Sequence, residues 1–260
     1  MTGGWDARIL RAGRLAAEEG PVAPLLHFYA RVLRHQQLIY DSFGARRPTG
    51  SIEADVDRIA VSGLPLVKAV AEDGPAPLVA EARALVDGSR SARAELLLAY
   101  WRARSDHDFF PKALLQPYAQ WLADTGAAPI ATDAPGADNR CPCCGGRPQL
   151  SILEAADSTS GDGSSRRLQC ASCLTTWAFR RVVCPSCGEE EERKLGYFEA
   201  PPMEHVRIDA CESCGRYLKT IDLRRLGVAV PLVDEVAAVP LDIWARERGY
   251  EKIELNLVGL

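Results

Sequence analysis

The chain has 260 residues, a length that suits two compact domains better than a single core. Hydrophobic residues make up 47% of the sequence and charged residues 25%, which excludes a wholly disordered chain, a collagen-like chain and a chain embedded throughout in a membrane. The 31 Lys and Arg against 35 Asp and Glu give a net charge of −4, so the composition predicts no general attraction to nucleic acid or to anionic lipid.

The first residues lack the basic and apolar regions of an export signal. The most apolar late stretch, 228–241, is interrupted by two prolines and two acidic residues, so we expect no membrane span. We therefore expect a cytoplasmic protein. In that compartment, cysteines more often bind metals or serve redox chemistry than form structural disulfides.

The N-terminal part predicts a bundle of helices. Apolar residues from Leu25 to Phe43 and from Ile52 to Val70 recur at the three-to-four spacing of one helical face. Further helices are predicted over 78–87, 91–104 and 108–124. We expect Ser51 and Asp108 to cap the helices that follow them and Pro117 to kink the last one.

After a turn-rich linker at 125–139, the pattern changes to short β-type runs separated by cysteine turns. The predicted strands cover 149–153, 166–170, 176–183, 194–198 and 205–210. A final helix is predicted from Val233 to about Arg248. We therefore expect an α+β protein with a helical domain over 1–136, two small cysteine modules over 137–181 and 182–229, and a C-terminal helix and tail over 230–260.

Eight of the nine cysteines form four Cys-x-x-Cys motifs. These are Cys141 and Cys144, Cys170 and Cys173, Cys184 and Cys187, and Cys211 and Cys214. Two intervening residues let the chain turn so that both sulfurs point at one ion. Two such turns that face each other form the tetrahedral four-sulfur site preferred by zinc or by a single iron. Gly145, Gly188 and Gly215 follow three of the motifs and can direct backbone N–H groups toward the thiolates.

The spacing of the motifs favours two sites filled in chain order. There are 25 residues between Cys144 and Cys170, 23 between Cys187 and Cys211, and 10 between Cys173 and Cys184. Sequential pairing therefore gives two ribbons, each with four ligand cysteines, although an interleaved pairing stays open. Because such small modules bury little apolar area, we expect the metal to supply much of their folding free energy, on the order of ten kcal/mol per site.

The remaining reactive residue types give weaker signals. Cys143 lies inside the first motif, where it could be a reactive thiol, an alternative ligand or a bystander. Four histidines, at positions 27, 35, 107 and 205, form no pair with metal-ligand spacing. From Cys141 to Lys219 ten basic and eleven acidic residues give a local charge of −1, which argues against nucleic-acid binding. No thioredoxin-like pattern surrounds the motifs, which argues against a redox dithiol enzyme.

The four motifs and their flanking residues together resemble the formate dehydrogenase accessory protein family (FdhE-type). The resemblance is carried by Cys141 to Gly145, Leu168 to Cys173 with Trp177, Val183 to Gly188, and Ala210 to Lys219 with its Tyr-Leu-Lys ending. It continues outside the cysteines, in Phe109 to Tyr118, Asp234 to Ala237, Leu241 to Trp244 and Glu247 to Tyr250. This sequence departs from the family pattern at Cys143. It also departs at Leu174, which follows Cys173 where the other three motifs are followed by glycine.

The resemblance implies a non-catalytic cytoplasmic maturation factor or chaperone that contacts the molybdenum-containing catalytic subunit of formate dehydrogenase. It also implies two rubredoxin-like modules that each hold one mononuclear metal ion, iron or zinc. An electron-transfer protein with rubredoxin-like iron is an alternative, and a ribbon-type nucleic-acid binder is a third. For the leading interpretation, we expect a partly exposed apolar surface that holds the client.

Overall fold

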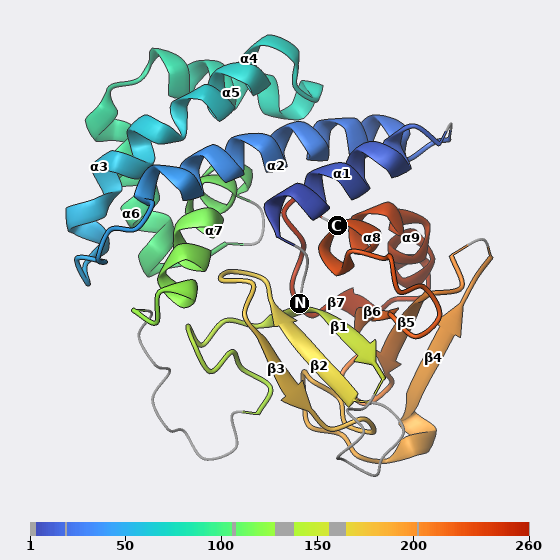
Figure 1. Cartoon of the computed structure of the whole chain (residues 1–260). Coiled ribbons are helices and arrows are strands. Elements are labelled where there is room, and N and C mark those ends of the chain that lie inside the picture. Colours follow the sequence, from blue (N-terminus) through green and yellow to red (C-terminus); the bar gives the residue numbers. More distant parts are fainter. Residues whose placement is uncertain are drawn as a thin grey trace. The chain divides into compact units, whose positions relative to one another are not determined.

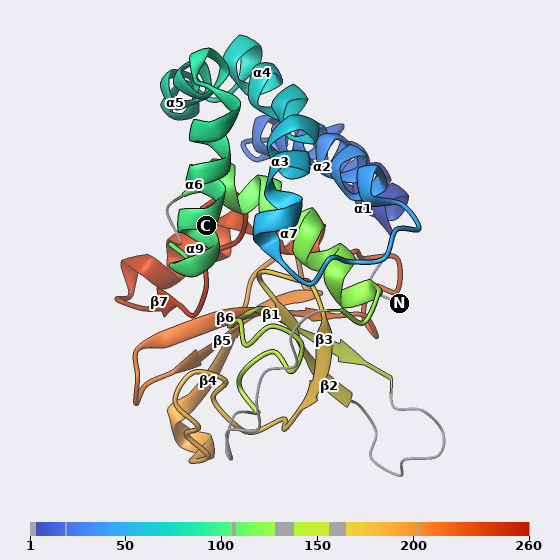
Figure 2. The ribbon, with the colours of Figure 1, turned by 90° about the vertical axis from the view of Figure 1, so that its left-hand side faces the viewer.

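The computed structural model describes residues 4–18, 20–105, 108–127, 138–155, 165–201 and 203–259. The chain divides into two compact units, the helical unit (Trp5–Pro129) and the sheet unit (Ile130–Val258). In Figures 1 and 2 the first is coloured from blue to green and the second from yellow-green to red. Part of the predicted linker, 128–137, lies outside the described residues.

The described part of the helical unit consists of helices joined by short connections. They are α1 (Trp5–Ala16), α2 (Ala23–Phe43), α3 (Ile52–Ser62), α4 (Leu64–Asp73), α5 (Ala76–Asp87), α6 (Arg90–Arg102) and α7 (Phe109–Asp124). The sequence pattern did not predict α1, because its buried face contains a charged residue, Arg8, beside small alanines. Arg8 is accommodated there by donating to Gln120 Oε1 at 3.0 Å.

Helix α7 packs against α2, α3 and α6 and is buried along most of its length. The ring of Phe43 stacks on Trp121 with centroids 4.7 Å apart and tilts against Tyr118 at 5.2 Å. Pro117 lies inside α7 without ending it. Asp108 occupies the N-cap position, as predicted, but its side chain makes no capping hydrogen bond. Packing of aromatic rings, rather than a cap, therefore fixes this helix.

The single helix predicted over 52–70 is wrong, because the structure divides it into α3 and α4 at Gly63. A Cβ at Gly63 would lie 2.5 Å from Leu114 Cδ2, so only glycine permits this close approach to α7. Pro65 in the first turn of α4 has no N–H to continue the hydrogen-bond ladder of α3. Ser51 precedes α3 but its hydroxyl donates to Glu53, at 2.7 Å, rather than accepting from the helix backbone.

The sheet unit contains one mixed sheet. Its elements are β1 (Pro148–Glu154), β2 (Ser165–Cys170), β3 (Thr176–Phe179), the 3₁₀ turn η1 (Glu192–Lys194), β4 (Leu195–Glu199), β5 (Val206–Cys211), β6 (Arg216–Asp222) and β7 (Glu251–Lys252). The strand order is β3-β2-β1-β6-β5-β4, with β7 paired to β6. All pairs are antiparallel except β1 with β6 and β6 with β7.

The parallel pairing of β1 with β6 joins the two cysteine modules. The sequence pattern predicts them as two small units. The motif reasoning did not predict β6, although its Tyr, Leu, Thr and Ile favour a strand. The predicted α+β class is confirmed, with a helical region, a sheet with two groups of cysteines and C-terminal helices. The modules share a continuous sheet and are therefore not independent ribbons.

The last predicted helix is also divided, into α8 (Pro231–Ala237) and α9 (Val239–Glu247), with Pro240 in the first turn of α9. These helices cover one face of the sheet. Their buried residues include Ala238, Leu241 and Ala245, which pack with Ile208 and Tyr217 of the strands. Alternate residues of β5 and β6 therefore face this core, and the residues between them face the opposite side.

A buried ionic network also connects α8 and α9 to the sheet. Four fully buried side chains take part: Lys219 of β6, Lys252 of β7, Glu235 of α8 and Asp242 of α9. Lys219 Nζ lies 2.9 Å from Glu235 Oε1 and also contacts Asp242. Tyr217 donates to Asp242 at 2.9 Å. Two positive and two negative groups thus balance inside the core.

Candidate metal centres

The first group of sulfurs comes from Cys141, Cys144, Cys170 and Cys173. The Sγ atoms of Cys141 and Cys173 are 3.5 Å apart, as are those of Cys144 and Cys170. Three of the four residues are buried and Cys144 is half-buried. The sulfurs belong to the turn before β1 and to the turn between β2 and β3, so the antiparallel β1–β2 pair brings the two motifs together.

The second group comes from Cys184, Cys187, Cys211 and Cys214. The Sγ atoms of Cys184 and Cys214 are 3.8 Å apart, as are those of Cys187 and Cys211. Cys187 is exposed and Cys214 half-buried, so this group is nearer to solvent than the first. The structure thus groups all eight cysteines in chain order, and the interleaved alternative does not occur.

Both groups fit a tetrahedral ion. Within each, the four sulfurs all lie within 4.8 Å of one another. A tetrahedron with metal–sulfur bonds of about 2.3 Å has edges of about 3.8 Å between sulfurs. The observed separations of 3.5 to 3.8 Å match that geometry. Each group could therefore hold one metal ion, and four thiolates suit iron and zinc equally.

The turn after each motif has the left-handed backbone that the sequence predicted for its glycines. Gly145, Gly188 and Gly215 have φ of 70°, 80° and 65°, and each donates to the carbonyl of the first cysteine of its motif at 2.9 to 3.0 Å. Leu174 follows the second motif, Cys170 and Cys173, with φ of 60°, a conformation that costs a non-glycine residue about 1–2 kcal/mol. Its side chain packs with Leu150, Ile152 and Leu232, which offsets that strain.

A second glycine, Gly146, is required by the first site itself. A Cβ at this position would lie 2.9 Å from Cys170 Sγ and 3.3 Å from Cys144 Sγ. The backbone therefore passes directly beside the sulfurs. Other polar groups face them as well, because Ser172 N–H donates to Cys170 Sγ at 3.3 Å and Ser186 N–H to Cys184 Sγ at 3.4 Å. Such hydrogen bonds stabilise thiolate charge.

The thiols of each group have strongly different proton affinities. Hydrogen bonds from Cys141 and Cys170 lower the pKa of Cys144 far below its ordinary value, whereas hydrogen bonds to Cys141 and Cys144 raise the pKa of Cys170. Burial raises the pKa of Cys184. A bound metal ion would replace the protons that the sulfurs share, because all four sulfurs then bind the ion as thiolates. The raised and lowered pKa values would then no longer apply. Cys143 is not in either group, and burial raises its pKa.

Arg166 is a structural residue beside the second group of cysteines that the sequence analysis did not single out. Its side chain is buried and forms an ion pair with Asp209 of β5 at 3.2 Å. The guanidinium also donates to the carbonyls of Arg180, Arg181 and Val183, at 3.4, 3.1 and 3.1 Å. These carbonyls thus accept from a side chain of β2, and β3 ends at Phe179 rather than at the predicted residue 183.

The sheet face opposite α8 and α9 lies beside the second group of cysteines. Arg207, Asp209 and Cys211 of β5 alternate with residues that face the helices, and they line a cavity of about 240 Å³. Val182 and Tyr197 also line it, and they are 48% and 65% exposed. We call this region, defined by these five residues, the open face. Strand β4, which carries Tyr197, ends the order of the described strands.

None of the histidines that the structure describes belongs to either group of sulfurs. His205 Nε2 lies 2.8 Å from Asp234 Oδ1, beside the N-terminus of α8. Burial lowers the pKa of His35, which lies in α2. His107 is outside the described residues.

Among the helices of the described residues, none combines the length and the apolar character that a bilayer crossing requires.

Two family models match adjoining parts of the sheet unit. They describe the central domain of FdhE, over residues 140–181, and the C-terminal domain of FdhE, over residues 182–258. A Protein FdhE homolog from Aquifex aeolicus is 40% identical over 121 residues, which are 46% of this chain and 42% of that relative. A homolog from Edwardsiella ictaluri is 31% identical over 174 residues, 65% of this chain and 54% of the relative. The matches thus span about half the length of these two curated relatives.

Longer matches extend over both units. A Protein FdhE homolog from Stutzerimonas stutzeri is 25% identical over 283 aligned positions, 97% of this chain and 89% of the relative. The crystal structure of the FdhE protein from Pseudomonas aeruginosa has a TM-score of 0.72 and 22% identity, and covers 99% of this chain and 97% of that one. The chain belongs to the FdhE family. The fold of an FdhE protein is therefore shared along the chain, and the two groups of cysteines lie in the regions that match the central and C-terminal FdhE domains.

Proposed function

We propose that this FdhE-family chain is a non-catalytic, metal-binding accessory protein that is needed to assemble active formate dehydrogenase. In this proposal the chain acts in the cytoplasm as a maturation factor or chaperone for the catalytic subunit. Membership of the FdhE family supports the accessory role. The metal ligands in the proposal are the eight cysteines of the two groups, and each group binds one mononuclear ion, iron or zinc.

The observation that carries the proposal is the open face beside the second group of cysteines. A surface that binds an immature subunit has to be partly apolar and accessible, and Val182 and Tyr197 meet both conditions. Cys184 is two residues after Val182, and it lines the same cavity as Cys211. A metal held by these cysteines would fix the segment at 181–185 against the sheet and thereby keep the shape of the face.

The chain's own residues explain how such a surface can stay rigid. Arg166 donates hydrogen bonds to backbone carbonyls of the segment before Cys184. The ion pair with Asp209 anchors the Arg166 side chain to β5. Tyr197 is steadied by Arg207, whose guanidinium carbon lies 5.2 Å from the ring centroid. A preformed face loses little conformational entropy when it binds, which favours capture of a partner that is itself incompletely folded.

A second function, electron transfer through rubredoxin-like iron, is favoured by the exposure of Cys187. A ligand sulfur at the surface would bring an iron at the second site near a redox partner. This alternative requires iron, whereas the accessory role works with either metal. A colourless, zinc-loaded protein would therefore exclude electron transfer, whereas iron colour would leave both functions open.

Co-purification tests the accessory role. The tagged chain would be expressed with the catalytic subunit of formate dehydrogenase in a bacterial host without its own FdhE protein. We expect the subunit to remain bound to the metal-loaded chain, and formate dehydrogenase activity to appear only when the chain is present. Failure to retain the subunit, together with full activity in cells that lack the chain, would overturn the proposal.

A further inference from the structure

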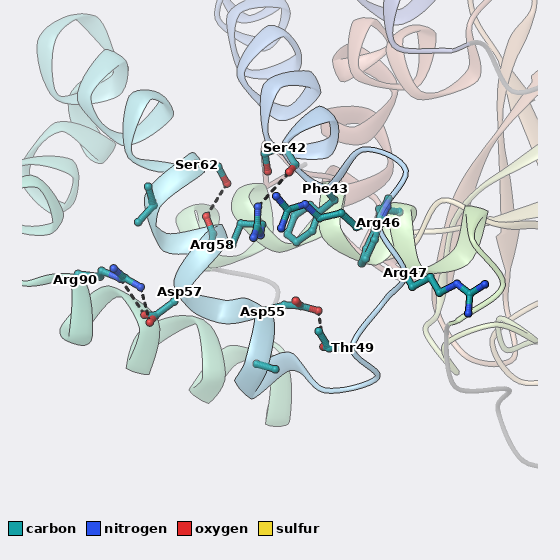
Figure 3. A pocket seen from close by; sticks show the side chains of 13 residues that line it. Ser42, Phe43, Arg46, Arg47, Thr49, Asp55, Asp57, Arg58, Ser62 and Arg90 are labelled. Atoms are coloured by element: carbon teal, nitrogen blue, oxygen red, sulfur yellow. Dashed lines mark hydrogen bonds and ion pairs between the residues drawn. The ribbon is translucent and has the colours of Figure 1, made fainter.

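The helical unit contains a cavity that has no part in the cysteine groups. Its volume is about 590 Å³, and it lies between the end of α2, the loop at 44–51 and α3 (Figure 3). Four arginines and two aspartates line it: Arg46, Arg47, Arg58, Arg90, Asp55 and Asp57. The charged lining therefore has an excess of two positive groups over negative ones. All of these residues belong to the helical unit.

Both aspartates are engaged with neighbouring residues. Asp57 Oδ2 forms an ion pair with Arg90 at 2.5 Å, so these two groups neutralise each other. Asp55 is buried, and its Oδ2 accepts from Thr49 at 2.9 Å and from Tyr118 at 3.0 Å. Figure 3 draws the Asp57–Arg90 and Asp55–Thr49 contacts on the lower side of the cavity. Neither aspartate therefore forms an ion pair with Arg46, Arg47 or Arg58 in the described part of the chain.

The guanidinium groups of Arg46 and Arg58 keep most of their donors available. Arg58 donates to the carbonyl of Ser42 at 3.4 Å and lies 5.9 Å from the ring of Phe43. Among the described residues, no hydrogen bond or ion pair engages the side chain of Arg46 or Arg47. In Figure 3 Arg47 extends away from the others, whereas Arg46 lies near Phe43 with Arg58.

We propose that this cavity binds a multivalent oxyanion, either a phosphate compound or a polycarboxylate, through Arg46 and Arg58. Guanidinium groups donate two parallel hydrogen bonds to the paired oxygens of phosphate or carboxylate, which a single positive point charge cannot do. Arg58 is half-buried and held by its contacts with Phe43 and Ser42, so little side-chain freedom is lost on binding. The cavity volume leaves room for a ligand the size of a nucleotide.

Isothermal titration of the full-length, metal-loaded chain with sodium pyrophosphate and with sodium citrate tests this site. We expect one anion to bind at a single site, and the stronger of the two identifies the class as phosphate or polycarboxylate. Sodium chloride at the same ionic strength serves as the control for simple screening. If neither anion binds at millimolar concentration, the proposal is overturned.

Substitutions locate the site. Arg46→Gln and Arg58→Gln should each weaken binding by about tenfold or more, since hydrogen bonds to charged groups contribute about 1.5–3 kcal/mol. Arg58→Lys should also weaken anion binding. Lysine keeps the positive charge but cannot donate the two parallel hydrogen bonds of a guanidinium group. Arg83→Gln, an exposed arginine of α5 outside the cavity, is the matched control and should bind as the unchanged chain does. Among the described residues the Arg46 side chain makes no hydrogen bond or ion pair, so its replacement should leave the fold intact. Undiminished binding by the Arg46 and Arg58 variants would contradict the assignment.

Discussion

Lys219 and Glu235 are both fully buried, and the ammonium nitrogen of Lys219 lies 2.9 Å from Glu235 Oε1. Lys219 ends the Tyr-Leu-Lys segment of β6, and Glu235 belongs to the Asp-Glu-Val-Ala segment of α8. Asp242 of a third such segment contacts the same lysine. Sequence segments that first suggested the FdhE family thus meet in one ionic network that fastens the C-terminal helices to the sheet.

Removal of one member of this network should strongly destabilise the sheet unit. Glu235→Gln leaves the buried Lys219 and Lys252 without their shared carboxylate, and such losses cost about 3–5 kcal/mol. Urea denaturation followed by circular dichroism measures the change. Arg225→Gln removes the partner of Glu199 in an exposed ion pair and is the control, with a much smaller loss because solvent screens that pair. Equal losses in the two variants would contradict the structural role of the network.

The same network predicts a dependence of stability on pH. Burial alone raises the pKa of Glu235, but the charges of Lys219 and Lys252 outweigh burial and hold that pKa at about 2, below its ordinary 4.5. A carboxyl whose pKa is lowered by folding stabilises the fold above about pH 4.5, and this contribution is lost as the pH falls toward 2. The free energy of unfolding of the Glu235→Gln variant should therefore vary less with pH across this window. Parallel curves for the variant and the unchanged chain would contradict the assignment.

Metal removal should affect the two units differently. Chelation under reducing conditions leaves eight thiols in place of metal-bound thiolates, and the turns that carry them lose their common anchor. Hydrogen exchange measured by mass spectrometry should show faster exchange at 141–146, 184–189 and 211–215. Helices α2 and α7 carry no cysteine and should keep their protection. Unchanged exchange in the cysteine turns would mean that the metal does not hold them.

Substitutions at Cys143 and Cys144 show which of these two cysteines in the first motif binds the metal. Cys144→Ser should reduce the metal content by one ion per chain, because its sulfur is one of the four in the first group. Cys143→Ser should leave the content unchanged, since Cys143 is in neither group. Elemental analysis of the purified variants gives the answer. A loss of metal from the Cys143 variant would show that this residue takes part in ligation.

Charge placed on the open face should impair client binding. Tyr197→Lys puts a cation beside Arg207 on a face that the accessory role requires to be apolar. We expect at least a fivefold loss of co-purified catalytic subunit. Leu38→Lys makes the same change at an exposed apolar residue of α2 and should have no effect. If the unchanged chain retains the subunit and the Tyr197 variant retains as much, the docking surface lies elsewhere.

The sequence predicted those features that depend on local pattern. Cysteine spacing and the following glycines indicated the two groups and their turns, since both are set within a few residues. The break at Gly63 was missed because its cause is contact with Leu114, a residue far away in sequence. The burial of Arg166 was missed for the same reason, since its partners are Asp209 and the carbonyls before Cys184. Likewise, the union of the two modules depends on the pairing of β1 with β6, which periodicity cannot reveal.

The central claim is that each group of four cysteines holds one metal ion. Elemental analysis combined with a visible spectrum, on protein purified without oxygen, tests it most directly. The account predicts two metal ions per chain, with thiolate-to-metal colour if they are iron and no colour if they are zinc. Clearly fewer than two metal ions in a folded, fully reduced sample would contradict it.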